Sequence, residues 1–295
     1  MSKKKVTIVL YNMFRMKKVF VLTAFMLFVI ALKVGATHRA LIFGLGRQAD
    51  ATWGKIHGDN DVFYVKQMLQ KSGYTDIVTL KNEQATKAAI VNAFKGLANR
   101  CVKGDKVYIH YSGHGQLMTD LDGDEGLKWN NSHAQWDEAW IPYDAYMVYG
   151  ANDRGEKHLC DDEIAELLQT IRNKIGKRGE LLVVVDACHS GDATCGPDDE
   201  ECVRGVDIKF SIPKQMNEEM PRLIEENWRT VSACKPFQLC TEMKDLQVGK
   251  LTYALYKMGM KVLKQDNEVL EQTLNTFMEQ HQGRVKQTPM VSGEQ

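Results

Sequence analysis

The sequence predicts an α/β sandwich built on a mainly parallel sheet, and two observations carry this prediction. Residues 181–185 form an unbroken aliphatic run, rich in valine, as in a strand that is buried on both faces of a parallel sheet. Short apolar runs of this kind alternate along the chain with longer segments of helical period. Right-handed crossovers between parallel strands then place helices on both faces of the sheet.

The expected elements follow one another in the order β-α-β-α-β-loop-α-β-loop-β-α-α. Strands are expected at residues 39–43, 77–80, 106–111, 181–185 and 228–233. Helices are expected at residues 58–71, 86–99, 249–263 and 267–281, and from residue 161 onward. Residues 192–226 are polar and interrupted by prolines, which predicts a surface loop with a short helix.

Residues 1–36 are expected to be a secretory signal peptide outside the fold, with Met16 as an alternative start. Lys17 and Lys18 precede an almost wholly apolar run at residues 19–32, and small residues follow at Val34 and Ala36. The run is short for a membrane span, which needs about 17–25 residues, although an uncleaved anchor is the alternative interpretation. We therefore expect an exported protein, periplasmic or secreted, without stable membrane insertion once the signal is removed.

The composition indicates a globular protein that does not bind nucleic acid. The formal net charge is +0 and the pI is near 7.1, so no basic excess is present to neutralise phosphates. A length of 295 residues suits one large domain or two small ones.

Seven cysteines occur, and export would place them in an oxidising compartment. Cys195 with Cys202, and Cys234 with Cys240, are close enough in sequence to close small disulfide loops. The connectivity cannot be deduced from spacing, however. No C-x-x-C pair occurs, so a structural zinc ribbon is not supported.

Two predicted strands end in residues suited to nucleophilic catalysis. One ends in Ser112-Gly-His-Gly115 and the other in Asp186-Ala-Cys-His-Ser-Gly191. If the strands are adjacent and parallel, His114 and Cys188 emerge at the same edge of the sheet. A thiolate there attacks a carbonyl, and an imidazole passes the proton to the leaving amine. The N–H groups of Gly115 and Cys188 are candidates for an oxyanion hole.

Other roles for these residues must be compared with catalysis. A lone cysteine is usually a small buried apolar residue, and a lone histidine in a turn is usually a polar turn residue. The glycine-flanked pair at two strand ends favours catalysis. His189 neighbours the thiol but points to another side, so His114 is preferred as the base. His110 is expected to pack under the sheet, since a spacing of four does not align two metal ligands on a strand.

Both motifs resemble the catalytic motifs of the metacaspases, which are caspase-like cysteine peptidases. Tyr111-Ser-Gly-His-Gly115 is similar to the histidine motif and Asp186-Ala-Cys-His-Ser-Gly191 to the cysteine motif. Similar stretches lie at residues 58–61, 120–125, 137–144, 161–164, 232–234 and 249–254. The resemblance covers about His38 to Met258 and is weaker toward the C-terminus. It suggests an exported, bacterial-type member of the clan that also holds caspases, legumain and gingipain.

The resemblance implies a caspase-like three-layer α/β/α sandwich with a mainly parallel six-stranded central sheet. It places a caspase-like peptidase domain at residues 37–295. This domain has a large-subunit-like part at 37–191, a loop at 192–226 and a small-subunit-like part at 227–295. No cofactor is required for the chemistry, and we expect a monomer.

The resemblance also implies cleavage of peptide or protein substrates after Arg or Lys, in a pocket formed by Asp61, Ser112 and Asp186. Two carboxylates suit bidentate binding of a guanidinium. Asp61 alone would also be explained as a carboxylate in the first turn of a helix. Asp186 ends a buried strand, where an unpaired charge is costly. Trp228 and Ser232 are further candidates for the same pocket.

Many members of this family are activated by calcium, and Asp137, Asp161 and Asp162 match their ligands. The fourth acidic position is occupied here by Cys195, a departure from the family pattern. Candidate substitutes are Asp192, Asp198 and Asp199. Asp161 and Asp162 would serve equally well as helix N-cap residues. Calcium is therefore expected as an activator at most.

The sequence thus predicts an exported cysteine endopeptidase of metacaspase type that acts through Cys188 and His114. Basic residues in the loop are candidate sites of self-cleavage: Arg204, Lys209, Lys214 and Arg222. One alternative is a catalytically weak caspase-like scaffold that binds peptides or partners. Another is a calcium-dependent adhesive domain built on residues 120–125. This one leaves the histidine and cysteine motifs without a purpose, and Gly126 and Asn131 do not fit an EF-hand.

Overall fold

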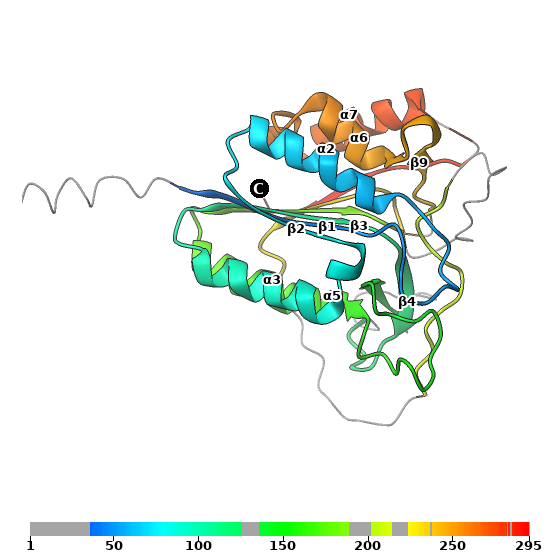
Figure 1. Ribbon diagram of the computed structural model, residues 1–295. Coiled ribbons are helices and arrows are strands. Elements are labelled where there is room, and N and C mark those ends of the chain that lie inside the picture. The colour runs from blue at the N-terminus through cyan, green and yellow to red at the C-terminus, as the bar shows by residue number, and fades with distance from the viewer. Residues whose placement is uncertain are drawn as a thin grey trace, which may run out of the picture. The chain divides into compact units, whose positions relative to one another are not determined.

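A six-stranded sheet in the order β11-β8-β7-β3-β1-β2 organises the unit formed by residues 38–295 (Figure 1). Its strands are β1 (His38–Gly44), β2 (Asp76–Lys81), β3 (Lys106–Ser112), β7 (Glu180–Asp186), β8 (Arg229–Ser232) and β11 (Met290–Gly293). All neighbours pair in parallel except β11, which runs antiparallel to β8. The mainly parallel six-stranded sheet is therefore confirmed.

The computed structural model describes residues 36–125, 136–188, 202–213, 224–236, 238–281, 283 and 285–294. The expected signal peptide lies outside them except for Ala36. Within these ranges, no helix has both the length and the apolar character needed to cross a membrane.

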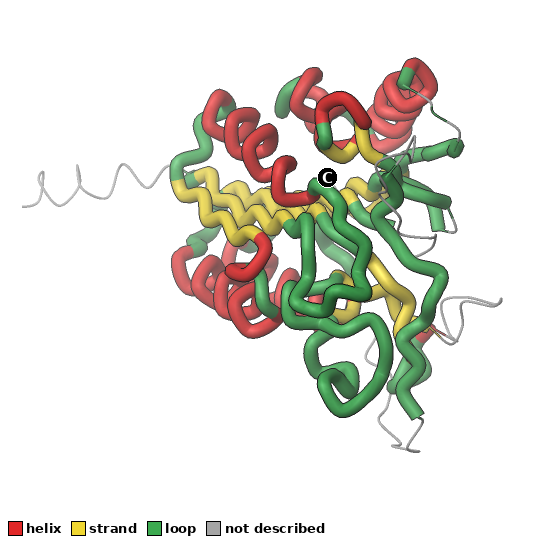
Figure 2. Tube along the Cα trace, turned by 45° about the vertical axis from the view of Figure 1, so that its right-hand side comes forward, coloured by secondary structure: helices red, strands yellow, loops and turns green. Residues whose placement is uncertain are grey.

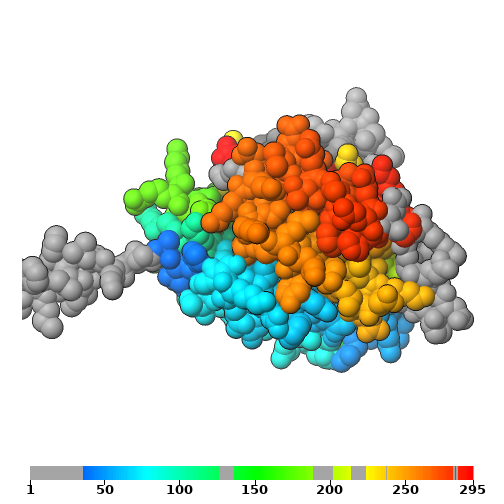
Figure 3. Space-filling view, turned by 90° about the horizontal axis from the view of Figure 1, so that it is seen from above, coloured from blue at the N-terminus to red at the C-terminus, as the bar shows by residue number. Residues whose placement is uncertain are grey.

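Helices cover both faces of the sheet, which gives the expected three layers. On one face lie α2 (Gly58–Lys71), α6 (Lys250–Met258) and α7 (Asn267–Gln280), and on the other α3 (Lys87–Arg100) and α5 (Asp161–Ile175) (Figures 1 and 2). Seen from above, α2 in cyan lies beside α6 and α7 in orange (Figure 3). Within the described part of the chain there are also three short 3-10 helices: Asn82–Gln84, Lys244–Leu246 and Val262–Lys264.

Successive side chains of the strands pack on opposite faces of the sheet, so the apolar core has two halves. Ala40 and Ile42 of β1 pack toward α2, α6 and α7, whereas Leu41 and Phe43 pack toward α3 and α5. Successive side chains of a strand point to opposite faces, so a wholly apolar strand is buried on both sides. Each large side chain among them, such as Leu41, Ile42 or Phe43, contributes about 1.5–3 kcal/mol to the free energy of unfolding.

Several short elements differ from the sequence prediction. β4 (Gly115–Thr119), β5 (Trp136–Trp140) and β6 (Leu159–Cys160) form a small antiparallel sheet, and β9 (Glu242–Met243) pairs with β10 (Val248–Gly249). Strands of two to five residues are too short to show a clear period. The helix expected at 249–263 ends at Met258, where Gly259 adopts a φ of +72°. The N-cap of α5 is Cys160, so Asp161 and Asp162 lie in its first turn and not at the cap.

The register of the parallel strands brings their polar ends to one edge. Ser112 of β3 lies opposite Asp186 of β7 and opposite Gly44 of β1. Gly58, the first residue of α2, packs against the same edge. A Cβ there would lie 2.5 Å from the Leu45 carbonyl oxygen and 2.6 Å from that of Ser112. Only glycine fits, so the start of α2 is held against the strand ends.

Candidate active site

Cys188 and His114 lie at this shared edge, each just beyond a strand. Cys188 follows β7 by two residues, His114 lies between β3 and β4, and both side chains are buried. The ring of Trp53 packs on the imidazole, with centroids 5.1 Å apart. His114 Nε2 lies 2.7 Å from the carbonyl oxygen of Gly54. Because a carbonyl only accepts hydrogen bonds, Nε2 carries the proton and Nδ1 keeps its lone pair.

The surroundings keep His114 neutral, as a base requires. Burial lowers the pKa of His114, while the hydrogen bond to Gly54 and the charge of the nearby Cys188 thiolate raise it less. Nδ1 has no hydrogen-bond partner among the described residues. A neutral imidazole with a free lone pair can accept a proton from a thiol at pH 7. Gly54 was not predicted, because a backbone acceptor leaves no signal in residue type.

The N–H groups of Gly115 and Cys188 converge on one atom, the backbone carbonyl oxygen of Arg204. The N···O distances are 3.3 Å from Gly115 and 3.1 Å from Cys188. Two N–H donors on one carbonyl oxygen, beside a thiol and a neutral imidazole, have the geometry of an oxyanion hole. The structure therefore brings together the two donors that the sequence suggested.

Residues 202–205 cross the site as an extended peptide. The N–H of Arg204 donates to the Cys240 carbonyl at 3.0 Å, and the N–H of Glu242 donates to the Cys202 carbonyl at 3.1 Å. Gly205 forms a parallel bridge with Gly115. The segment is thus held by backbone pairing on both sides, as an added strand is.

This segment corrects the expectation of a surface loop over residues 192–226. Val203, Arg204, Val206 and Phe210 are all buried. The segment is buried because it pairs with β4 and with the residues around β9, which are distant in sequence. Polarity and prolines alone did not reveal this pairing. Residues 192–201 and 214–223 of the expected loop lie outside the described residues.

The guanidinium of Arg204 fills a closed pocket with three carboxylates. Its Nη1 lies 2.7 Å from Asp61 Oδ2 and 3.5 Å from Asp186 Oδ1. Its Nε and Nη2 each lie 3.0 Å from Glu242 Oε1. All four side chains are buried. Burial alone would lower the pKa of Arg204, but the three carboxylates hold it well above its ordinary value.

The carboxylates differ in how firmly they keep their charge. Burial raises the pKa of Asp186 to about 6, against the lowering effect of Arg204. Burial would also raise the pKa of Glu242, but Arg204 and the ring of His57 hold it at about 2. Glu242 is therefore ionised at any physiological pH, whereas Asp186 takes up a proton below about pH 6.

The amino end of α6 fixes Asp61 and Asp186. Thr252 donates its N–H at 2.8 Å and its hydroxyl at 2.7 Å to Asp186 Oδ2. The N–H of Gly249 donates to Asp61 Oδ1 at 3.1 Å. These are the free N–H groups of a helix start, which favour anions. A Cβ on Gly249 would overlap Asp186 Oδ2 and lie 2.6 Å from Arg204 Nη1, so only glycine leaves the pocket open.

Ser112 reaches the pocket through a chain of hydrogen bonds. Its hydroxyl lies 2.9 Å from His110 Nε2, which lies 3.2 Å from the Thr252 hydroxyl. Burial lowers the pKa of His110 to about 3, so this ring is neutral. The side chain of the expected pocket residue Ser112 is thus linked to that of Asp186 only indirectly, through His110 and Thr252. The sequence did not indicate this polar network.

Trp228 and Ser232 line a different cavity, and their expected place beside Asp61 and Asp186 is wrong. A cavity of about 260 Å³ lies beside Cys188 and is lined by Trp228, Ser232 and residues of β7 and α5. Asp61 and Asp186 do not line it. Trp228 packs in the core on the α3 and α5 side of the sheet, whereas Asp61 belongs to α2 on the other side.

Acidic residues gather around β4 and β5. Two groups of carboxylates have oxygens within 4.8 Å of one another: Asp120, Asp124 and Asp137, and Asp122, Asp124 and Asp162. Asp137 is only 5% exposed, and its Oδ1 has no hydrogen-bond partner among the described residues. Burial raises the pKa of Asp137 to about 8, and the carboxylates of Asp120 and Asp162 act in the same direction. Such a set of oxygens fits a hard cation. Of the expected ligands, Asp161 lines the cavity beside Cys188 and belongs to neither group.

Most cysteines within the described residues are thiols. Cys202 is disulfide-bonded, whereas Cys188, Cys234 and Cys240 are in no disulfide. The sulfurs of Cys234 and Cys240 lie 2.9 Å apart. A hydrogen bond with Cys188 raises the pKa of Cys234, and burial, followed by the same neighbour, raises that of Cys240. Three thiols therefore adjoin one another. His189 and Cys195 lie outside the described residues.

The layers and strand order are those of a known class of fold, the caspase-like α/β sandwich. Caspase-1 from Spodoptera frugiperda has a TM-score of 0.56 over 88% of this chain and 86% of its own, at 10% identity. Protein GSU0716 from Geobacter sulfurreducens has a TM-score of 0.58 over 88% of this chain and 94% of its own, at 19% identity. At these identities the likeness shows the fold alone.

The sequence defines the family within this class. Residues 38–195 match the family model of the metacaspase, peptidase C14 domain. The chain therefore belongs to the metacaspase family.

Curated relatives agree with this assignment. Metacaspase-1A of Aspergillus terreus is 32% identical over 165 residues, or 52% of this chain and 36% of the relative. Metacaspase-1A of Aspergillus clavatus is 33% identical over 151 residues, or 48% of this chain and 31% of the relative. The matched region spans about a third of the length of these relatives.

Proposed function

We propose that the protein is a cysteine endopeptidase that hydrolyses peptide bonds after Arg or Lys. The position of Arg204 carries this proposal. Its side chain lies among three carboxylates, while its carbonyl oxygen receives the N–H groups of Gly115 and Cys188. A substrate with a basic residue before the cut would take the same place.

In the proposed reaction, Cys188 and His114 form the catalytic dyad. Nδ1 of His114 takes the thiol proton, and the thiolate of Cys188 forms a bond to the carbonyl carbon. The N–H groups of Gly115 and Cys188 stabilise the oxyanion. The C–N bond then breaks as His114 passes the proton to the leaving amine. Water, activated by the same imidazole, hydrolyses the thioester and restores the thiol.

Peptides that differ only at the residue before the cut test this proposal. The wild type is expected to cleave Arg and Lys peptides and to leave Asp peptides intact. Cys188→Ala and His114→Ala, at matched thermal stability, should lose at least about 10³-fold in kcat. The absence of turnover under reducing conditions, or a preference for Asp, contradicts the proposal.

Self-cleavage is proposed at a single bond, between Arg204 and Gly205. Four basic residues of the expected loop were candidates, and Lys214 and Arg222 lie outside the described residues. The side chain of Lys209 is exposed, with its Nζ 4.4 Å from the centre of the Trp136 ring. Arg204 alone among the described candidates has its carbonyl on the N–H groups of Gly115 and Cys188.

Intact-mass measurement of the reduced protein tests the position of the cut. We expect one fragment that ends at Arg204 and one that begins at Gly205, with a rate independent of protein concentration, because nucleophile and bond belong to one chain. Arg204→Ala should abolish this cut, and the matched control Lys209→Ala should retain it. A cut that persists in Arg204→Ala at the same bond refutes the assignment.

Calcium is proposed as an activator and not as a participant in the chemistry. Asp137 and Asp162, two of the expected ligands, lie in the carboxylate groups that also include Asp120 and Asp124. The buried Oδ1 of Asp137 and its raised pKa support a cation at this position. A bound ion would neutralise charges that burial disfavours.

A catalytically weak scaffold is the second candidate, because residues 202–205 cover Cys188, which is 1% exposed. The same peptide assay separates the two, since a scaffold binds an Arg peptide without cleaving it. Export and removal of residues 1–36 likewise remain a proposal. N-terminal sequencing of the mature protein tests it, with Thr37 as the expected first residue.

A further inference from the structure

The third carboxylate of the Arg204 pocket, Glu242, differs from the other two in the part of the guanidinium that it binds. Asp61 and Asp186 both contact Nη1, at the outer end of the group. Glu242 Oε1 accepts from Nε, inside the group, and lies equally close to Nη2. Because Nε is part of the stem, this contact depends on the shape of the side chain and not only on its charge.

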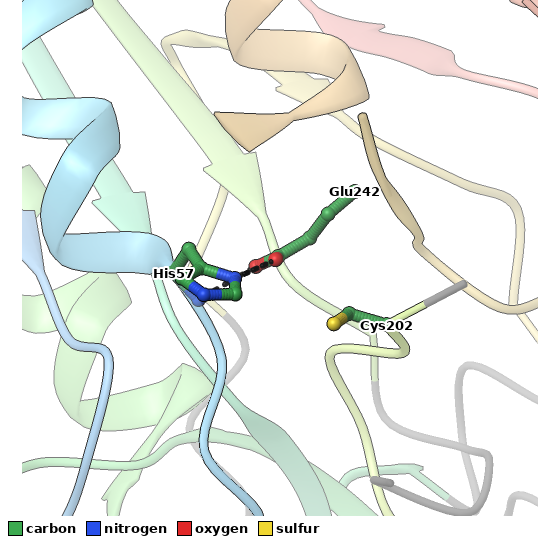
Figure 4. A group of neighbouring side chains, drawn as sticks. All are labelled: His57, Cys202 and Glu242. Atoms are coloured by element: carbon green, nitrogen blue, oxygen red, sulfur yellow. Dashed lines mark hydrogen bonds and ion pairs between the residues drawn. The ribbon is translucent and has the colours of Figure 1, made fainter. Parts of the chain in front are cut away.

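Glu242 is held in this orientation by His57, the residue before α2. The His57 N–H donates to Oε1 at 2.8 Å, and its Nδ1 lies 2.6 Å from Oε2, as Figure 4 shows. The hydrogen bond to Glu242 raises the pKa of His57 above its ordinary value. Cys202 lies nearby in Figure 4, but its sulfur is in a disulfide, so the three residues do not form a thiolate metal site.

A lysine in the same pocket would satisfy the carboxylates unequally. Its ammonium carries three donors at the tip, where Asp61 and Asp186 lie, but its stem has no donor at the position of Nε. Methylene groups would then face Glu242 Oε1, in a site where Glu242 is 3% exposed. A buried acceptor that loses its donor is unfavourable, and sites built around such a donor reject analogues that lack it.

We propose that Glu242, positioned by His57, is a specificity-determining residue that makes the pocket select Arg over Lys. This inference rests on the proposed peptidase function and assigns the discrimination to one contact, the hydrogen bond that Glu242 Oε1 accepts from the Nε of the substrate arginine. Asp61 attracts the positive charge of either an arginine or a lysine side chain, and it contributes little to the choice between them.

The test compares kcat/KM for two peptides that differ only in Arg or Lys before the cut. Arg204 competes equally with both peptides, so it cancels in the ratio. The wild type is expected to prefer Arg, and Glu242→Gln should lower the Arg-to-Lys ratio about 10- to 100-fold. The matched control Asp61→Asn should weaken both peptides and change the ratio less than about threefold.

His57 provides a second set of variants that leaves Glu242 in place. His57→Leu removes the ring donor and should lower the Arg-to-Lys ratio, while His57→Asn keeps a donor near Oε2 and should restore most of it. These variants also decide the question if Glu242→Gln does not fold. A ratio unchanged in folded Glu242→Gln or His57→Leu overturns the inference while peptidase activity stands. Failure of the wild type to cleave either peptide instead overturns the proposed function.

Discussion

Replacement of Arg204 by methionine should destabilise the protein strongly at neutral pH. The substitution keeps an apolar stem but removes the positive charge from among Asp61, Asp186 and Glu242. It is made in the Cys188→Ala background, so that self-cleavage does not interfere. Because all three carboxylates are buried, water cannot readily replace the guanidinium.

Two independent arguments give the size of the loss in unfolding free energy. Removal of one partner from a buried ion pair costs about 3–5 kcal/mol of unfolding free energy. Independently, Glu242 has a pKa of about 2 against an ordinary 4.5, with Arg204 as the main lowering influence. At about 1.4 kcal/mol per pKa unit, its ionisation contributes about 3 kcal/mol, most of which the variant would lose. We expect a loss of about 3–5 kcal/mol at pH 7.

Urea unfolding followed by circular dichroism measures this loss, and a fall of about 1–2 M in the midpoint is expected. Arg47→Met is the matched control, since Arg47 pairs with Glu83 on the surface and both side chains are about half exposed. It should leave the midpoint unchanged within error.

The loss of unfolding free energy in Arg204→Met should become smaller as the pH falls. Without Arg204, which lowers it, the pKa of the buried Asp186 would rise further above its value in the unfolded chain. The folded variant then binds more protons than the unfolded one, so its stability rises as the pH falls from 7 toward 5. The wild type gains less over this range, because Arg204 still lowers the pKa of Asp186. A variant as stable as the Arg47→Met control at pH 7, or a loss that grows at lower pH, refutes the assignment of a buried ion-pair pocket.

Three further outcomes are expected. Gly249→Ala should lower kcat/KM for Arg peptides about 10- to 100-fold with the circular dichroism spectrum unchanged, since its Cβ would overlap Asp186; an unchanged kcat/KM contradicts this. In the wild type, kcat/KM for Arg peptides should fall as the pH drops through about 6, where Asp186 loses its charge, and Asp186→Asn should lack this step. Calcium binding at pH 7 should release about one proton, because Asp137 has a pKa of about 8, and calorimetry in two buffers should show no such release from Asp137→Asn.

The sequence predicted the main sheet well because its signals are local. An apolar run such as residues 181–185 identifies a buried strand by itself, and helical periods identify α2 and α5. The short strands β4 to β6 and the hairpin β9-β10 lack such a signal. The end of α6 at Gly259 was missed because the apolar period continues through Leu263.

For the site, sequence patterns identified residues at strand ends and missed those that other segments bring there. His114 and Cys188 each follow a strong strand, so their approach follows from strand pairing alone. Glu242 and Gly54 carry no pattern, because one lies in a two-residue strand and the other acts through its backbone. Arg204 was one of four equivalent basic residues until the structure placed its carbonyl on the Gly115 and Cys188 N–H groups.

By itself, the sequence determined the sheet, its crossovers and the edge at which the thiol and imidazole meet, since those depend on short-range periodicity and on the rules of parallel strands. The tertiary structure alone decided what fills that edge. Arg204 meets Asp61 across 143 positions of sequence, and Gly249 meets the same carboxylate across 188. Groups so distant in sequence are brought together only when the whole domain folds, and no local sequence pattern predicts which of them will pair.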